Sequence, residues 1–373
     1  MINTYQSFSC NSTNSITFKQ SPPVSPEFFI LENDSVKAVF TNAGASLCGL
    51  FVSKNLKEFQ NIALGFPRPE DYLDNELCAG AVLGPAAGRI RDGRFSIGDH
   101  LLQLTRNDGR HHLHGGTYGL SRLIWQVSKY QKTELGGKLA FSVSLPDQTD
   151  GYPGSRCFHA EYTLDGTCLR LQLKAVSDQD TFFNLSGHTY FNLNPAASSS
   201  SCRTLGGLFQ RLTIPAPQVI FNTNEHIPAS LSPAEGTAFD FRHGAVLADM
   251  LGRFKTEKQI QWAKGYNHTF LLNSSGLPSA VLESMDGSVR LKLFTDAPCL
   301  VLYSGGFIDN SHIMWRNFED RKPSSHSLRT FPGCAVALEA QDIPDAPNQH
   351  FLPFQITKAG EVFSRLIEYH IEL

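Results

Sequence analysis

The sequence predicts an all-β protein, a large β-sandwich, and three observations lead to this prediction. Several segments alternate apolar and polar residues without a break, as strands with one buried face do. They are 36–40, 139–145, 169–174 and 289–293. Turn signals such as Asp165-Gly166 and Asp286-Gly287 separate these segments, as they do between hairpin strands. Patterns at helical spacing are scarce and short, and the best of them cover 69–77 and 244–251.

The chain is long enough to form one large domain. Its 373 residues are 41% hydrophobic and 18% charged, a composition typical of a globular protein that buries a sizeable core. A polar N-terminal stretch ends in the Pro- and Ser-rich segment 21–26, and such punctuation indicates a loosely attached piece of chain. We therefore expect a polar leader over 1–26 and a single β-sandwich domain over 27–373.

Charge, hydropathy and cysteine usage indicate a cytoplasmic protein with a small, neutral partner. A net charge of −3 provides no basic surface for nucleic acid or for an anionic membrane. The leader has neither the charged nor the apolar region of a signal peptide, and no apolar stretch approaches the ~18 residues that span a bilayer. The eight cysteines show no short Cys-x-x-Cys spacing, so we expect most of them to be reduced core residues.

Three histidines, His111, His112 and His114, lie within four residues. Imidazole is a common metal ligand, so a metal-dependent isomerase is one hypothesis for this segment. In a strand, His112 and His114 would share a face and His111 would point away. No carboxylate lies nearby in the sequence to complete a metal site. The glycines that follow, Gly115 and Gly116, would allow the backbone to approach a ligand closely.

Two further residues have side chains suited to proton transfer. His188 lies in a segment that alternates poorly, which is typical of a strand bent toward a site, and histidine exchanges protons near neutral pH. Glu339 follows an apolar run, so its strand carries a carboxylate into buried space, where it needs hydrogen-bond donors or a catalytic role. The alternatives are a core histidine bonded to the backbone and a structural ion pair between Glu339 and an arginine. Spacing alone does not bring the two residues together.

Eight short segments are informative through their order along the chain. They are Asp-Ser-Val-Lys-Ala-Val-Phe-Thr-Asn-Ala-Gly-Ala (34–45), Gly-Arg-Ile-Arg-Asp-Gly-Arg-Phe (88–95), Leu-His-Gly-Gly (113–116) with Trp125, Asp-Gly-Tyr-Pro-Gly (150–154), Gly-His-Thr-Tyr-Phe-Asn-Leu (187–193), Gly-Tyr-Asn-His-Thr-Phe (265–270), Tyr-Ser-Gly-Gly-Phe (303–307), and Leu-Glu-Ala-Gln (338–341) with Pro-Asp-Ala-Pro-Asn-Gln (344–349). Each segment is a weak signal by itself. Together they resemble the aldose 1-epimerase (galactose mutarotase) family over nearly the whole chain.

The resemblance implies a galactose mutarotase-like β-supersandwich that binds a free monosaccharide on its concave face, with no metal and no organic cofactor. It implies that His188 is the general acid at the ring oxygen and that Glu339 is the general base at the C1 hydroxyl. The residues that would contact the sugar are Arg89, His114, Asn267 and Tyr190. Opening a cyclic hemiacetal requires both proton transfers, so the activity is expected to follow a bell-shaped pH profile.

Four positions depart from the family pattern. They are Gly88 and Gly187 in place of asparagines, Asn267 in place of an aspartate and Val301 in place of a glutamine. Each lost hydrogen bond to a sugar hydroxyl is worth roughly 0.5–1.5 kcal/mol. The proton-transfer pair is retained while the residues that select the sugar differ, so another hexose, a pentose or a modified sugar fits the sequence as well as galactose does.

Two alternatives share the same fold. One is a hexose-6-phosphate 1-epimerase, in which Arg89, Arg91 and Arg94 would bind the phosphate. The other is a sugar-binding protein without turnover, against which the retention of His188 and Glu339 argues. The C-terminal segment 366–373 has the pattern of an exposed edge strand that can pair with a second copy, so we expect a monomer or a homodimer.

Overall fold

A computed structural model describes residues 6–10, 16–20, 25–53, 58–194, 206–273, 276–315 and 329–373. Strands dominate this part of the chain. Its helices are short, and they are α1 (Leu247–Arg253), α2 (Lys258–Ala263) and the 3-10 turns η1 (Pro69–Tyr72), η2 (Arg91–Gly93), η3 (Leu120–Arg122), η4 (Thr149–Gly151), η5 (Gly207–Phe209) and η6 (Ala346–Asn348). No helix among the described residues is both long and apolar enough to cross a bilayer.

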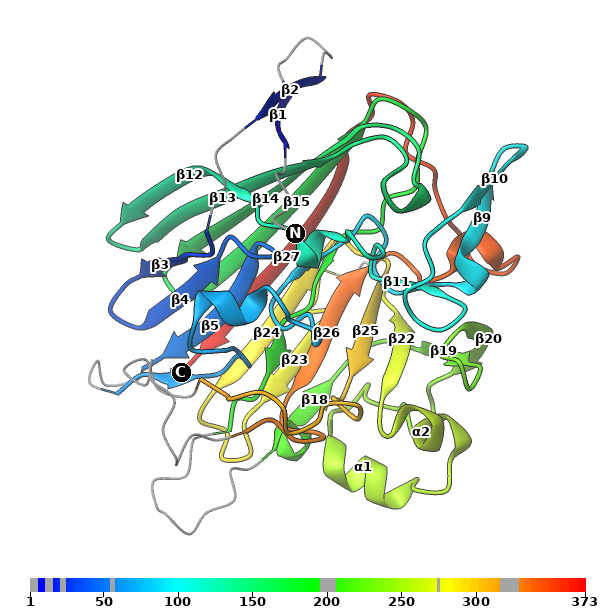
Figure 1. Cartoon of the computed structure of the whole chain (residues 1–373). Helices are drawn as coiled ribbons and strands as arrows, with labels where there is room; N and C mark the ends of the chain where they lie inside the picture. Colours follow the sequence, from blue (N-terminus) through cyan, green and yellow to red (C-terminus); the bar gives the residue numbers. More distant parts are fainter. Residues whose placement is uncertain are drawn as a thin grey trace.

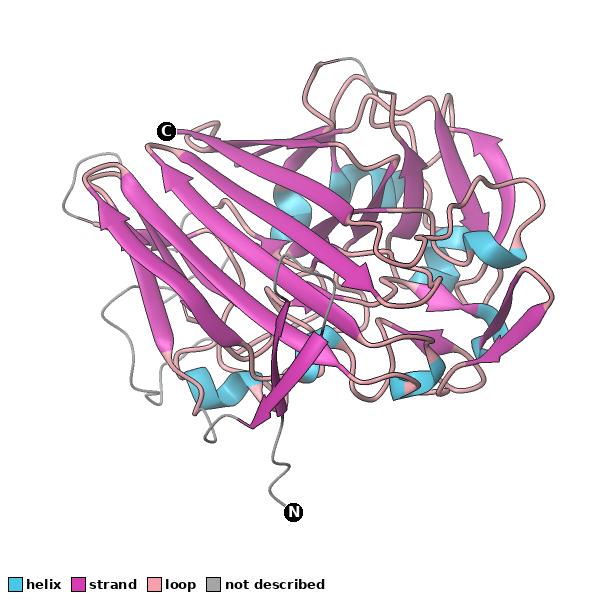
Figure 2. Ribbon diagram, turned by 90° about the horizontal axis from the view of Figure 1, so that it is seen from above, coloured by secondary structure: helices cyan, strands magenta, loops and turns pink. Residues whose placement is uncertain are grey.

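The largest sheet has nine strands, and its long members lie side by side in Figures 1 and 2. In spatial order they are β12 (Gln126–Thr133), β13 (Gly136–Leu145), β14 (Arg156–Asp165), β15 (Cys168–Ser177), β27 (Phe363–Glu372), β24 (Arg290–Thr295), β23 (Ala280–Glu283), β18 (Arg211–Thr213) and β21 (Ala245–Val246). Each neighbouring pair is antiparallel.

A second sheet has six strands (Figure 1), and each of them contributes at least one residue to the cavity described below. Its spatial order is β17 (Tyr190–Phe191), β26 (Val336–Gln341), β25 (Cys299–Tyr303), β22 (Asn267–Leu271), β19 (Gln218–Asn222) and β20 (Pro228–Pro233). These pairs are antiparallel as well.

Smaller sheets complete the fold. A four-stranded sheet contains β3 (Phe28–Glu32), β4 (Val36–Thr41), β5 (Ser46–Val52) and β6 (Gln60–Asn61). The two-stranded pairs are β1 (Gln6–Cys10) with β2 (Ile16–Gln20), β9 (Arg94–Ile97) with β10 (His100–Gln103), β8 (Arg89–Ile90) with β11 (His112–Leu113), and β7 (Val82–Leu83) with β16 (Ser186–Gly187). The short pairs β8–β11 and β7–β16 matter for function, because Arg89 belongs to the first and His188 directly follows the second.

One hydrophobic core joins the two large sheets. In β15, Leu169, Leu171 and Leu173 are buried in this core while the residues between them face outward, as the period of a strand requires. In β26, Leu338 and Ala340 enter the same core, but every residue of that strand is buried. Alternation therefore directs the intervening Glu339 to the opposite face of the strand, which is covered as well.

The structure confirms the all-β prediction and the four alternating segments, which form parts of β4, β13, β15 and β24. The helix expected over 69–77 is a 3-10 turn, and the one expected over 244–251 is α1, shifted toward higher numbers; α2 was not predicted.

The prediction that 366–373 forms an exposed edge strand is wrong. It belongs to β27, which pairs with β15 on one side and β24 on the other, so it offers no free edge. Of the predicted leader, β1 and β2 form a hairpin, and 1–5, 11–15 and 21–24 lie outside the described residues.

Candidate active site

One row of side chains crosses neighbouring strands of the six-stranded sheet. The register pairs Glu339 of β26 with Val301 of β25, and Val301 with Thr269 of β22. His188 extends this row on the other side of β26, because β17, which begins two residues later, pairs with β26 there. All four residues line a cavity of about 640 Å³. The sheet thus aligns a histidine, a carboxylate, an apolar side chain and a hydroxyl on one cavity wall.

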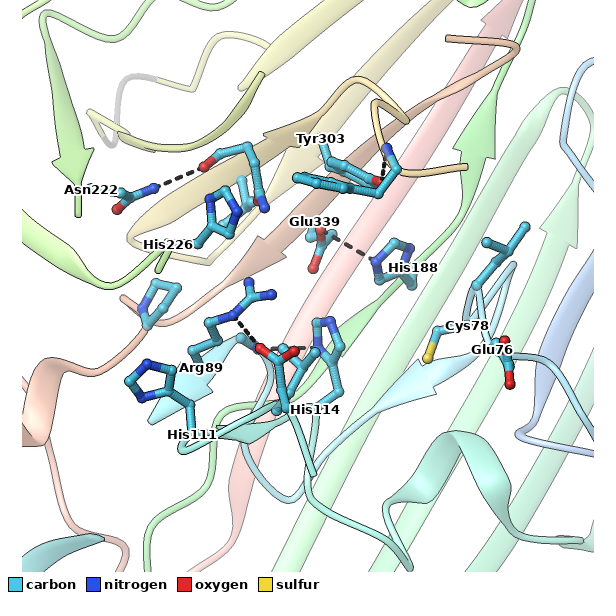
Figure 3. Close-up of a pocket in the computed structure, with 18 of the residues that line it drawn as sticks. Glu76, Cys78, Arg89, His111, His114, His188, Asn222, His226, Tyr303 and Glu339 are labelled. Atoms are coloured by element: carbon cyan, nitrogen blue, oxygen red, sulfur yellow. Dashed lines mark hydrogen bonds and ion pairs between the residues drawn. The ribbon is translucent and has the colours of Figure 1, made fainter. Parts of the chain in front are cut away.

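His188 and Glu339 form a buried pair (Figure 3). The Nε2 atom of His188 lies 3.5 Å from Oε1 of Glu339, and each residue is only 4% exposed. His188 leaves the regular strand between β16 and β17, which agrees with the bend that its poorly alternating segment predicts. Its ring packs against Tyr190 at a centroid distance of 4.7 Å. The structure therefore brings together the two residues that sequence spacing could not connect.

Burial controls the charge of Glu339. Loss of solvent raises the pKa of this carboxyl group, and the nearby charges of His188 and Arg89 lower it by a smaller amount. The sequence allows an ion pair with an arginine, but among the described residues the ion-pair partner of Glu339 is His188. A carboxylate with a raised pKa is a better proton acceptor than an exposed one, which suits a general base.

His114 is held as a neutral hydrogen-bond donor. Its backbone adopts a left-handed conformation with φ 51°, and its Nδ1 accepts a hydrogen bond of 3.2 Å from the backbone N–H of Gly88. The proton of the neutral ring is therefore on Nε2. Burial, with the neighbouring His188 second, lowers the pKa of His114 well below its usual range. Because the ring stays neutral, it can donate Nε2–H to a ligand near His188, whose ring centroid lies 5.5 Å away.

Arg89 reaches the same cavity from β8 (Figure 3). Its Nε donates to the Asp108 carboxylate at 2.7 Å, which fixes the guanidinium group. Arg91 and Arg94 do not line this cavity. Arg91 lies within hydrogen-bonding distance of the Asn348 carbonyl, and Arg94 is largely exposed beside Asp92. Of the three arginines that the sequence suggests for a phosphate, the structure brings only Arg89 to the cavity.

Asn267 and Tyr190 line the cavity in different ways. Asn267 is at the start of β22, and its backbone carbonyl accepts a hydrogen bond from the Asn222 side chain. The hydroxyl of Tyr190 donates to the Leu77 carbonyl at 3.1 Å, so its ring, rather than its hydroxyl, contacts the site. We expect Tyr190 to hold His188 in place more than to bind a ligand by hydrogen bonds.

Three of the four unusual positions line the cavity, and one does not. Gly88, Asn267 and Val301 lie on its wall. A Cβ atom at Gly88 would lie 2.9 Å from Pro344, so the glycine leaves room for close packing there. The inclusion of Gly187 among the altered ligand contacts is wrong, because a Cβ atom at this position would point at Leu171 in the core.

Gln341 is a site residue that the sequence analysis did not single out. It lies two residues after Glu339 on the same face of β26 and lines the cavity. Its side chain is fully buried, and neither amide atom has a hydrogen-bond partner among the described residues. Buried amides normally have partners, so this one is available to a polar ligand. The sequence does contain a signal for Gln341. Glu339 and Gln341 are two residues apart in the Leu-Glu-Ala-Gln segment, and residues two apart in a strand lie on the same face.

The three clustered histidines do not converge on one point. His112 uses both nitrogens in the core, with Nδ1 donating to the Thr105 carbonyl and Nε2 accepting from the Tyr152 hydroxyl. The expectation that His112 and His114 share a face is wrong, because the left-handed residue His114 ends the strand and turns toward the cavity. His111 also lines the cavity. A different trio, His114, His188 and Glu339, places its ligand atoms within 4.8 Å of one another.

Comparisons with known proteins agree with this architecture. The aldose 1-epimerase family model matches residues 27–370. Galactose mutarotase from Mus musculus is 30% identical over 342 residues, which cover 91% of this chain and 92% of that protein. Aldose 1-epimerase from Escherichia coli K12 is 28% identical, with 87% of this chain and 89% of that protein covered.

Solved structures show the same fold. Galactose 1-epimerase from Lactobacillus acidophilus NCFM superposes with a TM-score of 0.77 at 27% identity, covering 100% of this chain and 99% of that one. The aldose epimerase homologue from C. elegans gives a TM-score of 0.79 at 21% identity over 93% of this chain and 99% of that one, which supports the fold alone. The galactose mutarotase-like fold that the sequence predicts is confirmed, and the chain belongs to the aldose 1-epimerase family.

Proposed function

We propose that the protein is an aldose 1-epimerase that interconverts the α and β anomers of a free monosaccharide, with Glu339 as general base and His188 as general acid. The observation that carries this proposal is the buried contact of 3.5 Å between these two side chains on the wall of a cavity. A carboxylate and an imidazole at this distance can address two neighbouring oxygens of one substrate. Relatives named galactose mutarotase and aldose 1-epimerase support it.

Ring opening needs two proton transfers, and ring closure reverses both of them. The Glu339 carboxylate removes the proton of the C1 hydroxyl, the C1–O5 bond breaks, and O5 takes a proton from the His188 imidazolium. The open-chain aldehyde then rotates about its C1–C2 bond. Attack of O5 on the other face of C1 returns one proton to His188, and the new C1 oxygen takes the other from Glu339. Both side chains end in their starting states, so the protein is ready for either anomer.

The remaining polar groups of the cavity are suited to holding the sugar. Arg89, fixed by Asp108, and the neutral His114 supply donors, while the unpartnered amide of Gln341 supplies both a donor and an acceptor. Asn267 lies on the same wall. Such fixed contacts keep C1 and O5 between the catalytic side chains, and positioning of this kind contributes to the rate in addition to the proton transfers.

The direct test is equilibration of pure anomers. Polarimetry of freshly dissolved α-glucose, α-galactose and several aldopentoses, with and without the protein, should show faster equilibration than buffer for at least one sugar. Acceleration of none of them would refute the proposed activity, and a protein that then still bound a sugar by calorimetry would fit the alternative of a sugar-binding protein without turnover.

A phosphorylated substrate is the second candidate, and the cavity favours the free sugar. Arg91 and Arg94 lie outside it, and the charge of Arg89 is balanced by Asp108. Another arginine on the cavity wall, Arg110, is paired with Asp92 at 2.5 Å. Glucose 6-phosphate belongs in the same panel, and a clear preference for it over glucose would establish the alternative.

The pH dependence follows from the raised pKa of Glu339. The base acts only when ionised, so a pKa raised by burial moves the acid limb of the kcat/KM profile above the value of about 4.3 for an exposed glutamate. We expect kcat/KM to fall as the pH decreases through that raised pKa. A pH series of initial rates, corrected for the buffer-catalysed rate, measures the limb, and an acid limb at or below pH 4.3 would contradict the assignment.

We also propose that the protein acts in the cytoplasm. Cys48, Cys78 and Cys299 are buried free thiols, which fits the reducing compartment that the sequence predicts.

A further inference from the structure

The row on the cavity wall has a direction that orients the substrate. His188, Glu339, Val301 and Thr269 come from successive neighbours across the sheet, and adjacent strands are about 4.8 Å apart. The inference drawn from this row rests on the proposed function, in which His188 serves O5 and Glu339 serves the C1 hydroxyl. The first two positions of the row therefore fix one edge of the sugar ring.

Ring connectivity then places the next carbon. Within the ring, C1 is bonded only to O5 and C2. With O5 toward His188 and C1 at Glu339, C2 lies on the far side of Glu339 from His188. That side is occupied by Val301, which the register places directly beside Glu339. The substituent on C2 consequently faces the Val301 side chain.

Val301 offers this substituent no hydrogen bond. The next residue along the row, Thr269, lies one strand spacing beyond Val301, which is about 4.8 Å, and two spacings from Glu339. Tyr303 and Asn267 belong to the next row along the strands rather than to the position beside Glu339, and the Tyr303 hydroxyl accepts a hydrogen bond from the Phe307 backbone N–H while keeping its own proton. A hydroxyl group on C2 would therefore face an apolar side chain at the position beside Glu339.

We propose that Val301 is the specificity-determining residue at C2 and that the protein accepts 2-deoxyaldoses at least as well as the corresponding aldoses. A site discriminates strongly against a substrate that lacks a hydroxyl only when it holds a polar group that would then stay unpaired. Because Val301 is apolar, it is not left with an unpaired polar group when the substrate lacks the C2 hydroxyl. The polar groups Arg89, His114 and Gln341 remain for the rest of the ring.

Matched sugar pairs test the proposal. Initial rates of anomer equilibration are measured for glucose against 2-deoxyglucose and for galactose against 2-deoxygalactose, each corrected for its own spontaneous rate. The wild-type kcat/KM ratio of deoxy sugar to parent sugar is expected to be one or higher. In Val301→Gln the ratio should shift toward the parent sugar by about tenfold, because a tenfold change corresponds to about 1.4 kcal/mol, within the range for one hydrogen bond.

Two further variants keep the test decisive. Val301→Thr adds a hydroxyl at nearly constant volume and should shift the ratio in the same direction if the longer side chain of Val301→Gln disturbs folding. Val301→Ala, which stays apolar, should leave the ratio unchanged even if both rates fall. A wild-type preference of tenfold or more for the parent sugars, or equal ratios in all variants, would overturn the proposal.

If the protein lacks the proposed epimerase activity, the same sugar pairs give a different result. In that case none of the four sugars equilibrates faster than buffer, and the binding constants of the same pairs, measured by calorimetry on the wild-type protein, still report the preference at C2. Equal or tighter binding of the deoxy sugars supports the role of Val301, and weaker binding by tenfold or more contradicts it.

Discussion

Glu339→Gln is expected to lower kcat by about 10²–10⁴-fold, the usual contribution of one general base. The amide keeps the size of the side chain and remains beside His188, but it cannot accept the C1 hydroxyl proton. KM should change little, because the sugar contacts are made by other residues. Polarimetric initial rates over a range of sugar concentrations provide both constants, and Glu134→Gln, on an exposed turn, is the matched control. A loss of less than about fivefold would show that Glu339 is not the base.

The same variant should be at least as stable as the wild type at neutral pH. Burial raises the pKa of Glu339 in the folded protein above its unfolded value, so the group's contribution to stability is fully present below the unfolded pKa and is lost as the pH rises through the folded pKa. At pH 7 the ionised carboxylate therefore costs stability, which Glu339→Gln removes. Thermal unfolding between pH 4 and pH 8, an interval flanking the titration of glutamate, should show an advantage of the variant that grows with pH.

His188→Asn is expected to lower kcat by a similar factor of about 10²–10⁴, because O5 then leaves C1 without a proton donor. The double variant with Glu339→Gln should be little slower than the slower single variant, since the two residues act in one concerted unit. Losses that multiply in the double variant would mean independent roles. His100→Asn, on the exposed strand β10, controls for the substitution itself.

Strands with one solvent-exposed face could be predicted from the sequence. The strand that carries Glu339 could not be oriented in the same way. In β15 the alternation of leucines with polar residues marks the buried face directly. In β26 all six residues are buried, so composition does not reveal which of them face the core and which face the cavity. Only the neighbouring strands decide that, and the sequence of β26 contains no information about them.

The pairing of His188 with Glu339 depends on register between β17 and β26, which are distant in the sequence. No local pattern encodes that register, and at the level of sequence only the family resemblance indicates that the two residues act together. The direction of the His114 side chain could not be predicted from strand spacing for a different reason. Its left-handed backbone ends a two-residue strand and redirects the side chain, and a non-glycine residue in that conformation is not evident from residue type. The position of 366–373 inside the sheet likewise depends on strands far away in the chain.

The hydrogen bond from the Gly88 N–H to His114 has a consequence for how the site can evolve. The donor belongs to the main chain, so the hydrogen bond needs no side chain at position 88. The positive φ of Gly88 and the nearby Pro344 restrict which residues fit there, and a residue that does fit leaves the proton of His114 on Nε2. Position 301 lies beside Glu339, but its side chain takes no part in the proton transfers. Preference for a new sugar can thus be acquired one residue at a time, without an intermediate that has lost the chemistry.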